Sequence, residues 1–116
     1  MNIKFENKGI YSNGQKVIEF EYPIDQIVVY KKAIVVLLNH DFYKVNNENV
    51  FCIDHKGNLL WQVPSFEYID KRSPFVGIRR EGENVKLFNW SGEFVVIEPL
   101  SGKIIIHPKD SNKRPW

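Results

Sequence analysis

The sequence predicts an all-β protein, an antiparallel meander that forms a β-sandwich or a partly open barrel of roughly nine strands with little helix. Short runs rich in β-branched and aromatic residues alternate with turns that contain glycine, asparagine or aspartate. The stretch Asn49–Val63 holds two such runs around an Asp-His-Lys-Gly turn. Similar phrases recur at Val85–Gly92 and Val95–Gly102, each with a valine seven places before the turn glycine. This recurrence indicates consecutive hairpins rather than a solenoid, because no fixed period spans the chain.

The first hairpin is expected around Asn13-Gly14. Asn-Gly favours a type I′ turn, since both central residues need a positive φ. The turn joins the predicted strands Lys8–Tyr11 and Lys16–Tyr22. In the second strand, alternation assigns Ile18, Phe20 and Tyr22 to the core face, and Val17, Glu19 and Glu21 to a largely solvated face.

The run Ala33–Leu38 is the strongest candidate for a central strand. Its residues, Ala-Ile-Val-Val-Leu-Leu, show no alternation of apolar and polar side chains. A continuous apolar run of this length is typical of a strand that is buried on both faces. We therefore expect a sheet that is covered on both sides, or the inside of a sandwich.

Another hairpin turn is expected at Asp54-His55-Lys56-Gly57. The Asp54 carboxylate can accept hydrogen bonds from turn amides, and Gly57, at the fourth position, can adopt a positive φ. The final three strands are expected to form a meander, at Val85–Trp90, Glu93–Glu98 and Lys103–His107. The other strands are expected at Ile3–Glu6, Ile24–Tyr30, Val50–Ile53, Leu59–Val63 and Phe75–Arg80.

Size and composition indicate a single domain. A chain of 116 residues is long enough to bury one core, and we assign residues 1–108 to one antiparallel β domain and residues 109–116 to a polar C-terminal tail. The formal net charge of +2 is too small to imply a nucleic-acid or membrane partner. A single cysteine, no apolar signal segment and no membrane-length apolar run lead us to expect a cytoplasmic protein.

Few residues could carry catalysis. His40 beside Asp41 and His55 beside Asp54 lie in or next to predicted turns, where imidazoles are usually solvated. Cys52 lies in a hydrophobic strand, where a thiol is usually a small buried hydrophobe. The histidines and the cysteine are too scattered to predict a metal site, and no glycine-rich loop precedes a helix. We therefore expect no enzyme, no metal and no cofactor.

Two long polar connections, Asn39–Glu48 and Pro64–Pro74, carry aromatic residues among mixed charges. Such composition is typical of protein–protein contact surfaces. The alternative is that these aromatic side chains fold back and cap the ends of the sheets. The candidate partner-binding residues are Asp41, Phe42, Tyr43, Lys44, Phe66, Glu67, Tyr68, Asp70, Lys71 and Arg72.

Two resemblances follow from these motifs. Asn49–Trp61 resembles the strand, Asp-x-x-Gly turn and Trp-bearing strand of quinoprotein-type β-propeller blades, although the chain is too short for a closed propeller. Together, Asn49–Val63, Phe75–Arg79, Leu87–Gly92 and Ile97–Ile105 resemble small bacterial β-rich proteins, some of which are immunity proteins of polymorphic or contact-dependent growth-inhibition toxin systems.

The second resemblance implies a toxin inhibitor that works by protein–protein interaction. Our hypothesis from the sequence is thus an immunity protein with a cognate toxin domain as its partner. The alternative is a stand-alone β module that binds a small ligand or nucleic acid, the latter being unfavoured because acidic residues interrupt the basic ones.

Overall fold

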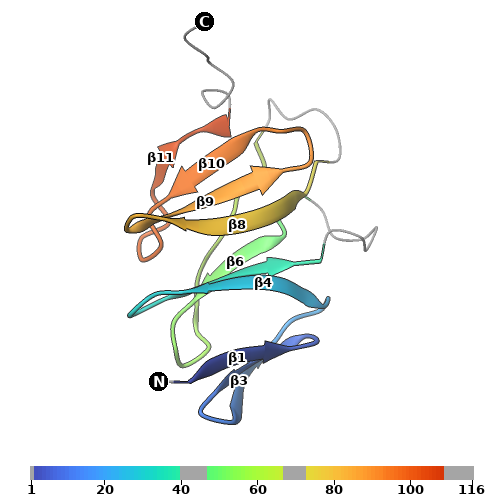
Figure 1. The fold of residues 1–116 in the computed structure, drawn as a ribbon, viewed down its shortest axis with the longest axis vertical. Helices are drawn as coiled ribbons and strands as arrows, with labels where there is room; N and C mark the ends of the chain where they lie inside the picture. The colour runs from blue at the N-terminus through green and yellow to red at the C-terminus, as the bar shows by residue number, and fades with distance from the viewer. Residues whose placement is uncertain (1, 40–46, 67–72, 109–116) are drawn as a thin grey trace, which may run out of the picture.

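The computed structural model describes residues 2–39, 47–66 and 73–108. Within these ranges the chain forms eleven strands in three antiparallel sheets, which are stacked along the long axis of the molecule (Figure 1). The N-terminal sheet has the order β1 (Ile3–Glu6), β2 (Gly9–Ser12), β3 (Gln15–Glu19). The middle sheet has the order β4 (Ile24–Val29), β5 (Ile34–Leu38), β6 (Val50–Ile53), β7 (Leu59–Gln62). The C-terminal sheet has the order β11 (Ile104–Ile106), β10 (Phe94–Ile97), β9 (Asn84–Asn89), β8 (Phe75–Glu81).

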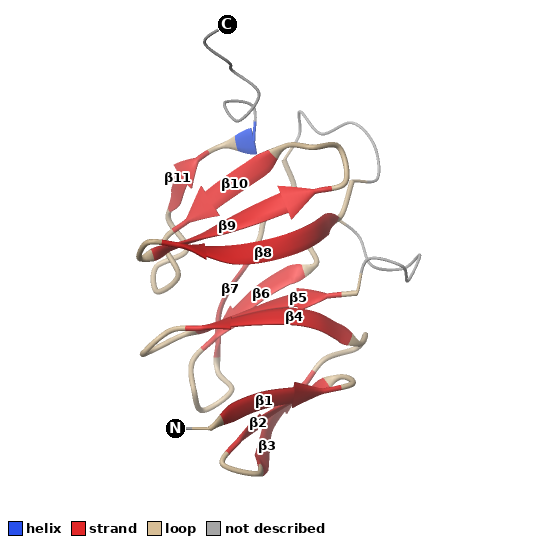
Figure 2. Cartoon of the chain, viewed as in Figure 1, coloured by secondary structure: helices blue, strands red, loops and turns tan. Residues whose placement is uncertain are grey.

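The predicted all-β antiparallel fold is confirmed, and strands make up nearly all regular structure in the described ranges (Figure 2). Every sheet is a simple meander in which consecutive strands pair. The packing is of the sandwich type, with a third sheet added. The described strands number eleven, which matches the individually predicted ranges but exceeds the overall estimate of roughly nine. Each four-stranded meander is comparable to one propeller blade, but the three sheets lie in a row and not around a closed ring.

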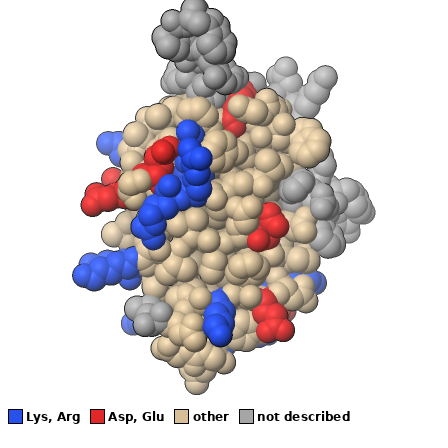
Figure 3. All heavy atoms as spheres, in the orientation of Figure 1, with Lys and Arg blue, Asp and Glu red and all other residues tan. Residues whose placement is uncertain are grey.

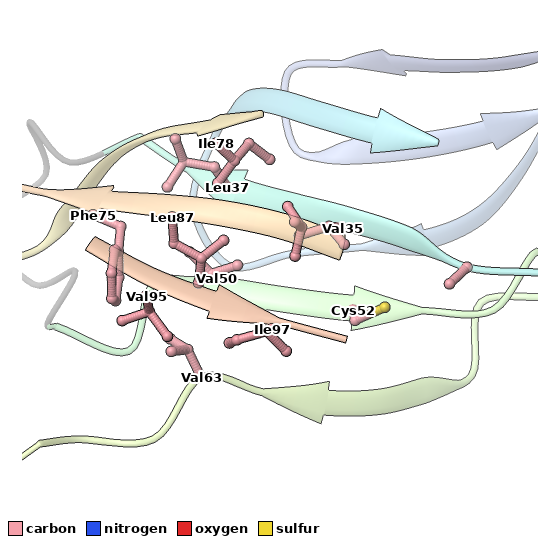
Figure 4. Packing of buried hydrophobic residues seen from close by; sticks show 12 residues of the cluster. Val35, Leu37, Val50, Cys52, Val63, Phe75, Ile78, Leu87, Val95 and Ile97 are labelled. Carbon is pink, nitrogen blue, oxygen red and sulfur yellow. The ribbon is translucent and has the colours of Figure 1, made fainter. Parts of the chain in front are cut away.

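Strand β5 is buried on both faces, as its apolar run predicted. Ile34, Val36 and Leu38 belong to the core between the N-terminal and middle sheets. Val35 and Leu37 belong to the second core, between the middle and C-terminal sheets (Figure 4). All five side chains are less than 5 % exposed, so β5 links the two cores. This double burial holds the three sheets together through apolar contact.

Turn chemistry fixes the hairpins as predicted. Asn13 and Gly14 have φ values of 50° and 84°, as a type I′ turn requires. The Asp54 carboxylate accepts hydrogen bonds from the amides of Lys56 and Asn58, both at 2.9 Å. These bonds, with the amide of Asn58 contributing most, lower the pKa of Asp54.

Val17 differs from its predicted orientation. It packs against the core between the N-terminal and middle sheets, beside Ile18, instead of facing solvent. The pairing of β2 with β3 is irregular between Ile10 and Tyr11, so strict alternation does not hold along β3. A β-bulge of this kind places two neighbouring residues opposite one and rotates the strand.

The sheets have two distinct ends. The short turns β4–β5, β6–β7, β8–β9 and β10–β11 lie at one end, which we call the turn end. The connections β5–β6 and β7–β8 and the turn β9–β10 lie at the other, which we call the loop end. The loop end therefore carries both long connections that the sequence singled out.

Candidate partner-binding surface at the loop end

Of the ten residues predicted to bind a partner, only Phe66 lies in a described range. Phe66 packs against the core of the middle and C-terminal sheets, and its ring lies edge-on to that of His107, with the ring centroids 6.4 Å apart. Phe66 thus covers the end of the core, the role that the alternative interpretation gives to the loop aromatics. The other nine lie outside the described residues: Asp41, Phe42, Tyr43, Lys44, Glu67, Tyr68, Asp70, Lys71 and Arg72.

The residues that flank the two long connections are held together by the side-chain amides of Asn47 and Asn49. The Asn49 side chain, 2 % exposed, donates to the carbonyl oxygens of Leu38 (3.1 Å) and Phe75 (2.9 Å), and accepts from the amide of Phe75 (2.9 Å). The side-chain oxygen of Asn47 accepts a hydrogen bond from the amide of Ser73 at 2.6 Å. Both ends of the first connection are therefore joined to the end of the second, although they belong to different sheets.

A third segment, the β9–β10 turn, joins this cluster. The hydroxyls of Ser73 and Ser91 lie 2.7 Å apart, and the amide of Ser91 donates to the Ser73 hydroxyl. The amide of Trp90 donates to the carbonyl oxygen of Pro74 at 2.9 Å. Hydrogen bonds thus connect residues 47–49, 73–75 and 89–93, and from here on the loop end means these residues.

The β9–β10 turn presents an indole to solvent. The buried Asn89 side chain accepts from the amide of Glu93 (2.8 Å) and donates to the Glu93 carboxylate (3.1 Å), which fixes the turn backbone. Trp90 is 68 % exposed, the highest value among the large hydrophobic side chains of the described ranges. Our sequence analysis did not single out Trp90, because it treated this tryptophan as the end of a strand. Its position directly before a Ser-Gly turn was the available signal.

We expect Asn49→Ala to lower the free energy of unfolding by about 2 kcal/mol, because three buried backbone groups lose their hydrogen-bond partner. Urea denaturation monitored by tryptophan fluorescence measures the loss. Asn58→Ala, in an exposed turn, is the control and should cost clearly less. An equal loss in both variants would show that Asn49 does not tie the sheets.

The candidate acid–base residues do not converge in the described part of the chain. His55 lies in the β6–β7 turn with Nε2 2.8 Å from the Tyr30 carbonyl oxygen, and His107 lies beside Phe66. His40 lies outside the described residues. Cys52 is fully buried, and its thiol donates to the carbonyl oxygen of Pro99 at 3.3 Å. Among the described residues, no group of three His, Cys, Asp or Glu side chains could hold a metal ion.

Burial raises the pKa of Cys52 to about 12, because the thiolate would lose its hydration. The thiol therefore stays protonated through neutral and mildly alkaline pH. We expect alkylation by iodoacetamide at about pH 8 to be at least ~100-fold slower in the folded protein than in the urea-unfolded chain. Mass spectrometry of timed samples measures both rates. Comparable rates would mean that the thiol is accessible and ionised.

The basic residues of the C-terminal sheet are mixed with acids and lie over aromatic rings. Figure 3 shows Lys and Arg atoms in a band over this sheet, with Asp and Glu atoms beside it. Arg79 and Lys86 lie over Phe88, at 5.2 and 5.3 Å from the ring centroid, and Lys86 also lies 3.5 Å from a Glu81 oxygen. These cations are engaged within the sheet, which gives no support to an extended nucleic-acid surface.

Comparison with known proteins identifies a family whose description names no function. No helix in the described ranges has the length and apolar character to cross a bilayer. No curated protein gives a significant match to the sequence. A family model matches residues 1–108, and the chain belongs to that family, whose description is Domain of unknown function (DUF7957).

Proposed function

We propose that this protein is an immunity protein that binds a cognate bacterial toxin domain through the loop end and neutralises it. The observation that carries this proposal is the exposed Trp90, held on a hydrogen-bonded turn beside the joined ends of two aromatic-rich connections. Tryptophan is among the residues that most often dominate the energy of protein interfaces. Because hydrogen bonds fix the turn backbone, little backbone freedom would be lost when Trp90 binds.

Inhibition in this proposal needs no reactive group. The immunity protein would cover the active site, or another essential surface, of the toxin domain. Trp90 would fill a pocket on the toxin, and the charges in the two connections would set orientation and association rate. Asp41, Lys44, Glu67, Asp70, Lys71 and Arg72 are the charged residues that the sequence offers for this purpose.

In this role the protein would act in the bacterial cytoplasm, where it would intercept a toxin that enters from a neighbouring cell. Two features support this role: the buried cysteine needs no oxidising compartment, and the loop end presents the exposed side chain of Trp90. The tight binding typical of inhibitors requires a preformed surface, and the network around Asn49 and Ser73 provides one.

The test uses the toxin domain encoded next to this protein. We expect the purified pair to associate with a Kd in about the nanomolar range or below, measured by biolayer interferometry. Co-expression should restore growth to cells that the toxin arrests. A Lys16→Ala variant, altered at an exposed position of the N-terminal sheet, should behave like the wild type. Absence of both association and rescue would overturn the proposal.

A further inference from the structure

The turn end contains a cleft of about 490 Å³ that the partner-binding surface does not use. Three turns form its walls: 30–33 from the middle sheet, and 82–84 and 98–100 from the C-terminal sheet. Its volume falls within the roughly 300–1,000 Å³ of small-molecule sites. The cleft lies at the opposite end of the strands from Trp90, so it could be occupied independently of a protein partner.

Arg80 stands at this cleft in a fixed orientation. Its guanidinium lies over the ring of Tyr30, 4.2 Å from the centroid, and donates a hydrogen bond to the carbonyl oxygen of Val29. The Tyr30 hydroxyl in turn donates to the carbonyl oxygen of Asn84 at 2.7 Å. A planar guanidinium that is held by a ring and a carbonyl is preorganised to bind a planar or tetrahedral oxyanion.

Arg80 has no carboxylate within 4.0 Å among the described residues, so most of its N–H donors are available. Lys31 and Lys32, both exposed, add two positive charges at the cleft. Glu83 and Glu98 also line it, but the Glu98 carboxylate accepts a hydrogen bond from the Ser101 hydroxyl at 2.6 Å. The cleft therefore presents three cations against two acids, of which one is already hydrogen-bonded.

The 98–100 turn adds apolar lining and is also fixed. Pro99 and Leu100 belong to this turn, and Leu100 is 55 % exposed. The carbonyl oxygen of Pro99 accepts hydrogen bonds from the Trp61 indole (2.7 Å) and the Cys52 thiol (3.3 Å), which anchors the β10–β11 turn to the middle sheet. A ligand in this cleft would thus meet both an oriented guanidinium and apolar side chains.

We propose that this cleft binds a small anionic ligand, an organic phosphate or carboxylate whose apolar body packs against Pro99 and Leu100 while its oxyanion pairs with Arg80. Lys31 and Lys32 would add electrostatic attraction, which weakens as ionic strength rises. This site is separate from the loop end and does not depend on toxin binding. The immunity protein would then carry a second, small-molecule site.

The probes are phenyl phosphate, benzoate and, as the uncharged match, phenol, titrated into ¹⁵N-labelled protein at low salt. We expect saturable shifts of the amides of Lys31, Ala33, Gly82 and Leu100 with at least one anion, with a Kd in about the millimolar range or tighter. Whether phosphate, carboxylate or both bind identifies the oxyanion. Equal shifts with phenol, or no saturable shifts with either anion, would overturn the proposal.

Two neighbouring variants separate oriented recognition from net charge. Arg80→Lys keeps the charge but removes the planar fork, so the Kd should rise about tenfold. Arg79→Lys, the next residue, whose guanidinium lies over Phe88 rather than Tyr30, is the matched control and should leave the Kd unchanged. Lys32→Gln removes one positive charge at an exposed position, so it should weaken anion binding several-fold. Equal weakening by Arg80→Lys and Arg79→Lys would contradict a fixed guanidinium site.

The outcome is independent of the proposed function. A Trp90→Ala variant should bind the small anions as the wild type does, since Trp90 lies at the other end of the strands. If the wild-type protein bound the toxin domain but no small anion, only the cleft proposal would be wrong. If it bound the anions but no toxin domain, only the proposed immunity function would be wrong.

Discussion

Gly57→Ala is expected to lower the free energy of unfolding by about 3 to 5 kcal/mol, a large part of the stability of a domain of this size. Gly57 has a φ of 92°, in the left-handed region that alanine disfavours. A Cβ atom at this position would also lie 2.2 Å from the carbonyl oxygen of Val17 and 2.9 Å from its carbonyl carbon. Backbone atoms cannot rotate away, so the N-terminal and middle sheets would have to separate.

Gly92→Ala is the matched control for this experiment. Gly92 has a nearly equal φ of 87°, but a Cβ there would meet nothing within 4 Å. It should cost only about 1 kcal/mol, the conformational part of the penalty. Urea denaturation of both variants gives the two losses, and their difference measures the contact between the sheets. Equal losses would mean that the close approach of Gly57 to Val17 does not exist in solution.

Trp90→Ala is expected to weaken binding of the toxin domain by about 2 to 4 kcal/mol, or roughly 30- to 1,000-fold in Kd. Trp90 is the most exposed large apolar side chain that the described ranges present, and its turn is fixed by Asn89 and Ser91. Truncation would remove the apolar anchor without removing a core contact. Biolayer interferometry with the toxin domain gives the change in Kd.

The control for Trp90→Ala is Leu100→Ala at the turn end. Leu100 is 55 % exposed, so its truncation also removes apolar surface, but on the far side of the sheets. It should leave the Kd for the toxin domain within about twofold, since residues outside an interface contribute little. Urea denaturation midpoints of both variants should stay close to that of the wild type. If Leu100→Ala weakened the complex and Trp90→Ala did not, the loop end would not be the interface.

Local features of the fold follow from short-range chemistry and were predictable. Asn13 and Gly14 form the expected turn because few other dipeptides accept two positive φ values. Strand β5 is buried on both faces because five consecutive aliphatic side chains have no other stable position. The hairpin around Asp54 and Gly57 is likewise determined within a few residues.

Other features depend on contacts between residues far apart in the sequence. Alternation predicted that Val17 faces solvent, but the irregular pairing of β2 with β3 brings it to the core. The division into three sheets is set by how the hairpins pack on one another, which no single hairpin encodes.

The loop end illustrates the same limit. Asn49 read as an ordinary residue before a strand, yet it bonds to Leu38 and Phe75, which lie 11 and 26 residues away. The aromatic composition of the two long connections indicated a binding region, and the ends of those connections do meet at one end of the molecule. Trp90 lies beside these ends only because the fold brings the β9–β10 turn to the same end of the molecule.

Amide hydrogen exchange of the protein, alone and bound to the toxin domain, tests most directly whether the loop end is the working surface. We predict slower exchange on binding for residues 47–49, 73–75 and 89–93, and little change for residues 30–33 and 82–84 at the turn end. Protection confined to the turn end or to the N-terminal sheet, with the loop end unchanged, would contradict this assignment.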